Sequence, residues 1–92
     1  MVEIVKTEGV LGGKARLEGR RISVYGIGES YVEVGTSPEE IADQLDISLA
    51  EVHAALAYYY EHPDEMATIR DRRDRLAEEL RDESKAPERL SQ

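Results

Sequence analysis

The chain has 92 residues, a formal net charge of −8 and no cysteine. This length predicts one small domain with a limited core, for which association with a second chain is an expected source of stability. The composition excludes a disulfide framework and a thiolate metal site, and no apolar run is long enough for a membrane span or the core of a signal peptide. We therefore expect a cytoplasmic protein without a cofactor.

The acidic excess is concentrated in the middle of the chain. Residues 1–36 and 67–92 each carry equal numbers of acidic and basic side chains, and residues 37–66 contain acids but no Lys or Arg. A DNA-binding segment normally carries bases that neutralise phosphates. The preference for acids, and for Arg over Lys, is typical of proteins from halophilic organisms, where the screening length at molar salt is only about 3 Å.

The first 24 residues predict a small β-hairpin. Residues 3–7, 14–17 and 20–24 have strand-like patterns separated by glycine turns, and Val10 and Leu11 are candidates to resume the pairing. Because so small a sheet is marginal alone, we expect a homodimer through this segment. The candidate dimer-interface residues are Ile4, Val10, Leu11, Leu17 and Ile22. Gly12-Gly13 and Gly26-x-Gly28 lack the spacing of phosphate-binding loops, so they predict turns.

A first helix is expected from Val24 to Val34. Val24, Ile27, Tyr31 and Val34 recur at helical spacing, and Gly35 is placed to end the helix in a left-handed conformation.

Residues 37–62 predict a helix-turn-helix. Ser37 precedes Glu40, and Ser48 precedes Glu51, by the three residues that define a capping box at a helix start. Apolar residues follow at spacings of three and four, and Ile47 in the intervening turn is expected to point into the same core.

A last helix is expected from Pro63 to about Glu83, followed by a disordered tail. Its narrow stripe is formed by Met66, Ile69, Arg73, Leu76 and Leu80, which we take as candidate partner-binding residues. Two interpretations stay open: a tail that becomes ordered on a protein partner, and a helix that packs in a dimer or is solvated.

The predicted architecture is mainly α, with a small N-terminal β-hairpin, a three-helix, homeodomain-like helix-turn-helix core and a long C-terminal helix. Residues 1–69 form the domain, residues 70–83 a charged extension, and residues 84–92 the tail.

In a helix-turn-helix, the first turns of the second helix face the major groove. The candidate DNA-binding residues are Lys14, Arg16, Arg20, Arg21, Ser48, Ala50, Glu51, His53 and Ala54. Alternatively, Glu51 is only the capping partner, His53 is solvated, and the four bases form salt bridges on the strands.

No enzyme chemistry is indicated. His53 and His62 are nine residues apart, and the pairs Glu39-Glu40 and Glu78-Glu79 read as solvated helix faces. No spacing typical of a metal site or a nucleophile–base pair is present.

An ordered series of motifs resembles a known family. The segments are Gly13–Val24 (GKARLEGRRISV), Gly35–Ile41 (GTSPEEI), Leu49–Tyr59 and His62–Glu65 (HPDE). Together they are similar to the domain of unknown function 433 family of VapB-like antitoxins, from about Glu3 to Ile69. Arg20 departs from the Thr usual there, and the charged extension after Ile69 has no counterpart.

This resemblance implies a dimer formed by the β-segment, a toxin partner of PIN-type nuclease fold, and repression of the pair's own promoter through double-stranded DNA. We therefore expect an antitoxin-like DNA-binding regulator. A protein-binding adaptor that does not touch DNA, and a structural dimer module, are the alternatives.

Overall fold

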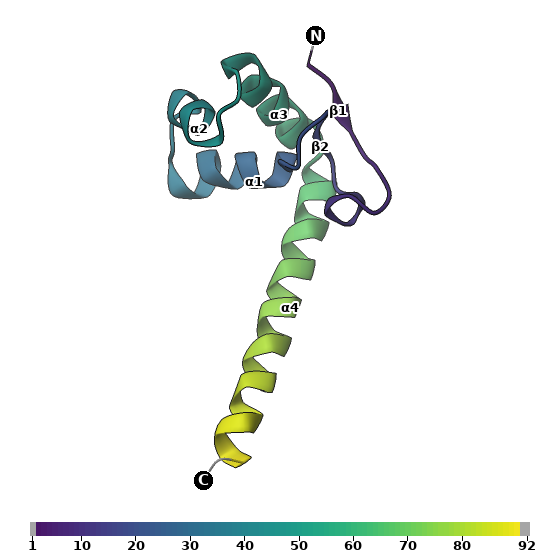
Figure 1. The fold of residues 1–92 in the computed structure, drawn as a ribbon, viewed down its shortest axis with the longest axis vertical. Coiled ribbons are helices and arrows are strands. Elements are labelled where there is room, and N and C mark those ends of the chain that lie inside the picture. The colour runs from purple at the N-terminus through teal and green to yellow at the C-terminus, as the bar shows by residue number, and fades with distance from the viewer. Residues whose placement is uncertain (1, 91–92) are drawn as a thin grey trace.

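The computed structural model describes residues 2–90, with side chains as far as Glu83. The elements are β1 (Ile4–Val5), β2 (Arg16–Leu17), α1 (Val24–Glu29), α2 (Pro38–Leu45), α3 (Leu49–Glu61) and α4 (Pro63–Leu90). In Figure 1, α1, α2 and α3 gather into a head, the hairpin lies beside α3, and α4 projects away as a rod. The predicted mainly helical architecture with a small hairpin is confirmed.

The hairpin is smaller than predicted. β1 and β2 pair antiparallel, with Ile4 opposite Leu17. Val10 and Leu11 do not resume the pairing, because Leu11–Gly13 form a 3-10 turn, η1, with positive φ at all three residues. The predicted strand at residues 20–24 is reduced to one bridge between Arg16 and Ser23. Closely spaced glycines favour turns over a continuous ladder here.

The first helix changes its winding partway. α1 ends at Glu29 and continues as a π-helical turn, η2 (Ser30–Val34). Gly35 ends the segment in the left-handed conformation, as predicted, at φ 84°. The predicted single helix over residues 24–34 is therefore correct in extent and wrong in uniformity.

The helix-turn-helix is confirmed, and the turn uses a residue that the sequence did not single out. Asp46 takes the left-handed conformation at φ 55°. The Ile47 N–H then donates to the Ala42 carbonyl over 3.0 Å, which satisfies a carbonyl of the last turn of α2. Ile47 is 9% exposed and points into the core, as predicted.

Only one of the two predicted capping boxes is complete. Around Ser48, both hydrogen bonds of the box are formed. At Ser37, the hydroxyl accepts from the Glu40 N–H over 3.2 Å, while the Glu40 side chain is exposed and makes no reciprocal bond within the described residues. Pro38, at the first helical position, favours the start of α2 because its fixed φ angle suits a helix.

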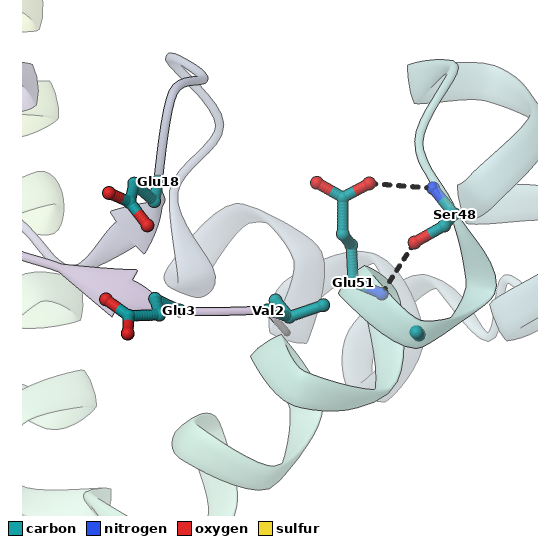
Figure 2. A pocket seen from close by; sticks show the side chains of 6 residues that line it. Val2, Glu3, Glu18, Ser48 and Glu51 are labelled. Carbon is teal, nitrogen blue, oxygen red and sulfur yellow. Dashed lines mark hydrogen bonds between the residues drawn. The ribbon is translucent and has the colours of Figure 1, made fainter.

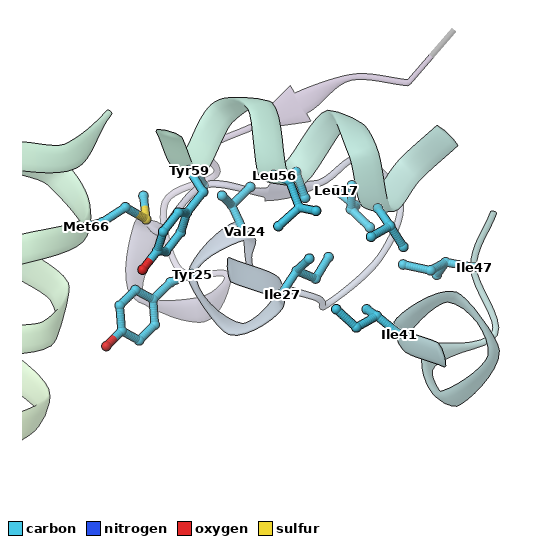
Figure 3. Packing of buried hydrophobic residues seen from close by; sticks show 12 residues of the cluster. Leu17, Val24, Tyr25, Ile27, Ile41, Ile47, Leu56, Tyr59 and Met66 are labelled. Atoms are coloured by element: carbon cyan, nitrogen blue, oxygen red, sulfur yellow. The ribbon is translucent and has the colours of Figure 1, made fainter. Parts of the chain in front are cut away.

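One apolar core joins the hairpin, the three helices and the start of α4. In Figure 3, Ile41 and Ile47 lie at one end of this core, Leu17, Ile27 and Leu56 in the middle, and Tyr25, Tyr59 and Met66 at the α4 end. The core members are Ala15, Leu17, Val24, Tyr25, Ile27, Ile41, Ile47, Val52, Ala55, Leu56, Tyr59 and Met66.

The last helix is longer than predicted. Pro63 separates it from α3, as expected, because proline is tolerated in a first turn but not inside a helix. α4 continues past the predicted end near Glu83 to Leu90, although Pro87 lies in this stretch and lacks the N–H that would donate within the helix. Of the predicted disordered tail, residues 84–90 are thus helical, and Ser91 and Gln92 lie outside the described residues. The predicted boundaries at 69/70 and 83/84 fall inside this one helix.

Gly28 permits the closest approach between α1 and α3. A Cβ built on Gly28 would overlap the Tyr59 ring, whereas at Gly26 the nearest atom is the Ser23 Oγ, at 3.1 Å. We expect Gly28→Ala to lower the free energy of unfolding by about 1–3 kcal/mol, measured by urea denaturation, because the two helices must move apart. Gly26→Ala, in the same helix, is the control and should change stability by no more than about 1 kcal/mol. Equal effects of the two substitutions would contradict this account of the contact.

Candidate interaction surfaces

The start of α3 is closed by a network of three candidate DNA-binding residues, Arg20, Ser48 and Glu51. The Ser48 N–H donates to the Glu51 carboxylate over 2.9 Å, and the Arg20 Nε donates to the same group over 2.8 Å. The pKa of Glu51 is held below its ordinary 4.5. The largest cause is the hydrogen bond from the Ser48 backbone, and the next is the bond from Arg20. Both charged side chains are therefore paired with each other.

The other basic residues of the predicted cluster differ in whether their side chains are available to contact phosphates. The Arg16 guanidinium donates to the Arg20 carbonyl over 2.9 Å and to the Thr7 hydroxyl over 3.0 Å, so it braces the hairpin. Lys14 and Arg21 are exposed and make no ion pair within residues 2–83. Two of the four predicted phosphate contacts are thus occupied by the protein itself.

The surface around the first turn of α3 is acidic. Ser48, Ala50 and His53 are exposed, and Ala54 is half-buried. A shallow depression of about 400 Å³ is lined by Val2, Glu3, Glu18, Ser48, Ala50 and Glu51. Figure 2 shows Glu3 and Glu18 side by side on the hairpin across from the capping box. Three carboxylates in this position repel a phosphate backbone.

The predicted dimer residues are mostly used within the protomer. Leu17 is fully buried in the core, and Ile4 and Ile22 pack against it while partly buried. Val10 precedes the η1 turn, Leu11 is its first residue, and both are half-buried. Leu17 is therefore closed to a second chain, and dimerisation through the strands stays a prediction.

A carboxylate on α1 joins three helices. Glu29 accepts hydrogen bonds from the Tyr25 hydroxyl (3.1 Å), the Tyr59 hydroxyl of α3 (3.1 Å) and the Arg70 guanidinium of α4 (3.2 Å). Arg73 lies 3.6 Å from the same carboxylate, and its guanidinium carbon is 5.7 Å from the centre of the Tyr25 ring. The side chain of Glu29 is only 15% exposed. This Glu29 cluster fixes α4 to the head.

The cluster changes the proton affinities of its members. Burial alone would raise the pKa of Glu29, but the bonds from Arg70, Tyr25 and Tyr59 outweigh it and hold this pKa below its ordinary 4.5. Burial and the bond to Glu29 raise the pKa of Tyr25 and of Tyr59. The two phenols thus stay protonated and donate to a charged carboxylate.

A second, smaller cluster ties the N-terminal segment to α4. The Lys6 ammonium and the Tyr58 hydroxyl each donate to the Glu65 Oε1 over 2.9 Å. Burial would raise the pKa of Glu65, and the bonds from Lys6 and Tyr58 lower it overall. Because Lys6 follows β1, this contact brings the hairpin up to α4.

A groove runs between the η1 turn and α4. It measures about 370 Å³ and is lined by Gly12, Lys14, Tyr25, Ile69, Arg72, Arg73 and Leu76. Its floor is apolar and its three charged lining residues are all basic. In a chain of net charge −8, it is a place where cations and apolar surface coincide.

The predicted partner-binding stripe on α4 is divided between the core and solvent. Met66 is 2% exposed inside the core, and Ile69 packs against it while half-buried. Leu76 and Leu80 lie farther along the rod and are 55% and 53% exposed. Only the outer part of the stripe is thus accessible to another molecule.

Sequence reasoning did not single out Glu29, Tyr25 or Arg70. The available indication was the position of Arg70, which lies four residues after Met66 and so on the core side of α4. A charged side chain there needs a counter-charge from the head.

We expect Glu29→Gln to lower the free energy of unfolding by roughly 1–3 kcal/mol, because two cations lose their buried carboxylate. Since the pKa of Glu29 is lowered on folding, its contribution is present above about pH 4.5 and is lost as the pH falls below that value. Urea denaturation from pH 3.5 to 7 checks both points. Glu33→Gln, an exposed carboxylate in the neighbouring turn, is the control. An acid-side loss of stability as large in Glu29→Gln as in the wild type would contradict the assignment.

Within the described part of the chain, no helix is both long and apolar enough to cross a membrane. Among the same residues, no three His, Asp or Glu side chains form a group suited to a metal ion.

Comparison with known proteins identifies a family for the N-terminal part of the chain, and the match ends before α4. No curated protein and no solved structure matches the chain. The sequence does match one family, described as "Protein of unknown function (DUF433)", over residues 4–59, which is more than half of the chain and includes the hairpin and α1 to α3. The chain therefore belongs to the DUF433 family.

Proposed function

We propose that the protein is an antitoxin-like adaptor that holds a protein partner, of PIN-type nuclease fold, on the outer part of α4. The observation that carries the proposal is the course of the apolar stripe. It begins in the core at Met66 and continues along the rod to Leu76 and Leu80, which are more than half exposed.

The surroundings of the stripe support the same function. The groove beside it offers an apolar floor with a basic rim, formed by Lys14, Arg72 and Arg73. Such a surface suits a partner segment that carries apolar side chains flanked by carboxylates. The Glu29 cluster holds the arm in one direction, which reduces the entropy lost on binding. The identity of the partner class rests on the family resemblance.

The partner proposal is tested by co-expression with the protein encoded next to this chain, using recovery of the complex and relief of growth arrest as readouts. We expect the paired substitution Leu76→Asp and Leu80→Asp to abolish both, because charges replace the apolar anchors. Leu49→Asp, at an exposed leucine (41%) on α3, is the matched control and should leave both intact. Loss of the complex with Leu49→Asp alone would place the partner on the head and contradict the proposal.

Promoter binding through α2 and α3 is the second candidate function. The observation in its favour is the geometry of the pair: two short helices with serine N-caps, joined by a tight turn that fixes their angle. Against it stand the acidic surface near Ser48 and the Arg20–Glu51 pair. Any affinity for DNA would have to come from the few basic side chains that form no ion pair within the described residues.

For this second function we expect weak binding to the chain's own upstream DNA. The slope of log K against log salt should be no steeper than about −2 per protomer, because Lys14 and Arg21 supply two phosphate contacts. Glu51→Gln should steepen the slope by about one, since it releases Arg20 while Gln still suits the capping position. Glu39→Gln, an exposed acid of α2, is the control for charge alone. Equal slopes for all three proteins would contradict a role for Arg20, and no binding at low salt would rule out the function.

A further inference from the structure

The exposed part of α4 is divided into a basic half and an acidic half. Residues 70–75 contain four arginines and two aspartates, whereas residues 78–83 contain four carboxylates and one arginine. Within the acidic half, Glu78 and Asp82, and Glu79 and Glu83, are like charges four residues apart, which destabilises an isolated helix. A basic neighbour along this half would relieve that repulsion.

Four positions on one face of α4 are arranged symmetrically about the level of Glu78. Measured from the level of Glu78, Leu76 and Leu80 lie two residues to either side, and Arg73 and Glu83 lie five residues to either side. All four share one face of α4, opposite to Glu78 itself. A two-fold axis through this level therefore sets Leu76 against Leu80 of a second chain, and Arg73 against its Glu83.

The groove lies at the Arg73 end of this paired face. It opens beside Leu76, Ile69 and Tyr25, and its rim is formed by Lys14, Arg72 and Arg73. In an antiparallel pair, the level of this groove coincides with residues 80–87 of the second chain, in which Asp82 and Glu83 are balanced in number by Arg81 and Lys85, so the charge match at this level rests on the Arg73–Glu83 contact. Arg73 is 57% exposed and lies 3.6 Å from Glu29 and from Asp74, so Glu83 of a second chain would be a third carboxylate to which its guanidinium donates.

We propose that two copies of this chain associate through an antiparallel pair of α4 helices. Leu76 and Leu80 of each chain form the apolar centre, and the Arg73–Glu83 pair forms twice, once at each end. At 1.5 Å per residue, the two heads lie on the order of 35 Å apart at opposite ends of the pair. This dimer is separate from the one expected through the N-terminal strands.

The pairing goes beyond the proposed function and concerns the same stripe. Because Leu76 and Leu80 cannot face a second copy and a nuclease at once, partner binding requires the arms to separate. The pairing is measured on this protein alone, so its failure leaves the partner proposal untouched.

Thiol crosslinking tests the geometry, because the chain contains no cysteine of its own. Full-length Leu76→Cys and Leu80→Cys proteins are mixed and treated with a short bismaleimide. Antiparallel pairing predicts mainly mixed 76–80 dimers. Mainly 76–76 and 80–80 dimers, or no more product than with Glu78→Cys on the opposite face, would overturn the proposal.

Charge reversal tests the ion pairs by sedimentation over a range of protein concentrations. We expect Glu83→Arg to raise the dissociation constant roughly tenfold, because two attractive contacts become repulsive. Glu78→Arg makes the same charge change on the opposite face and should have little effect. A wild-type chain that remains monomeric, or a Glu83→Arg protein that associates as tightly as the wild type, would overturn the pairing. Because Glu83 is exposed, this variant is not expected to disturb the head.

Discussion

The direction of α4 depends on the carboxylate of Glu29. Pro63 interrupts the helix after α3, so the path of α4 is not inherited from the helix before it. Burial of Met66 anchors its first turn, and the bonds from Arg70 and Tyr59 to Glu29 fix its rotation. Among the described residues, the Nε atom of Arg70 is buried without a hydrogen-bond partner, which is tolerable because the rest of the guanidinium faces a charged acceptor. One acid on α1 therefore determines where the outer stripe points.

The head uses its other charges in a similar way, to complete local structure. Glu51 closes the N-terminus of α3 and holds Arg20, while Arg16 spans the hairpin turn. Side chains that a nucleic-acid-binding domain presents to phosphates are here bonded to the protein. The surface that suits an interaction therefore lies on the flank of α4 and not at the tip of α3. There the groove combines apolar side chains with basic ones.

Much of the fold could be predicted from the sequence because its determinants are local. The serine caps, Pro38, Gly35 and Pro63 set the ends of helices through their own backbone preferences. The Glu29 cluster could not be predicted, since Glu29 and Arg70 are 41 residues apart and their meeting depends on how α1 and α4 pack. For the same reason, Leu17 reads as an interface residue in a strand pattern and proves to be core. Periodicity predicts which face of an element is apolar. Only the packed structure shows whether that face is covered by the same chain or left for another molecule.

The division between the head and α4 nearly coincides with the end of the family match. The match to DUF433 covers residues 4–59 and thus contains Glu29, Tyr25 and Tyr59, whereas Arg70, Arg73 and the outer stripe lie beyond it. The head supplies an acceptor with its two phenols, and the arm supplies the cations that dock on it. Since α4 contributes both the docking cations and the exposed Leu76 and Leu80, changes in its outer part alter the exposed surface without touching the core of the head. Under the proposed function, partner choice is therefore a property of α4, and the head acts as the rigid support that orients it.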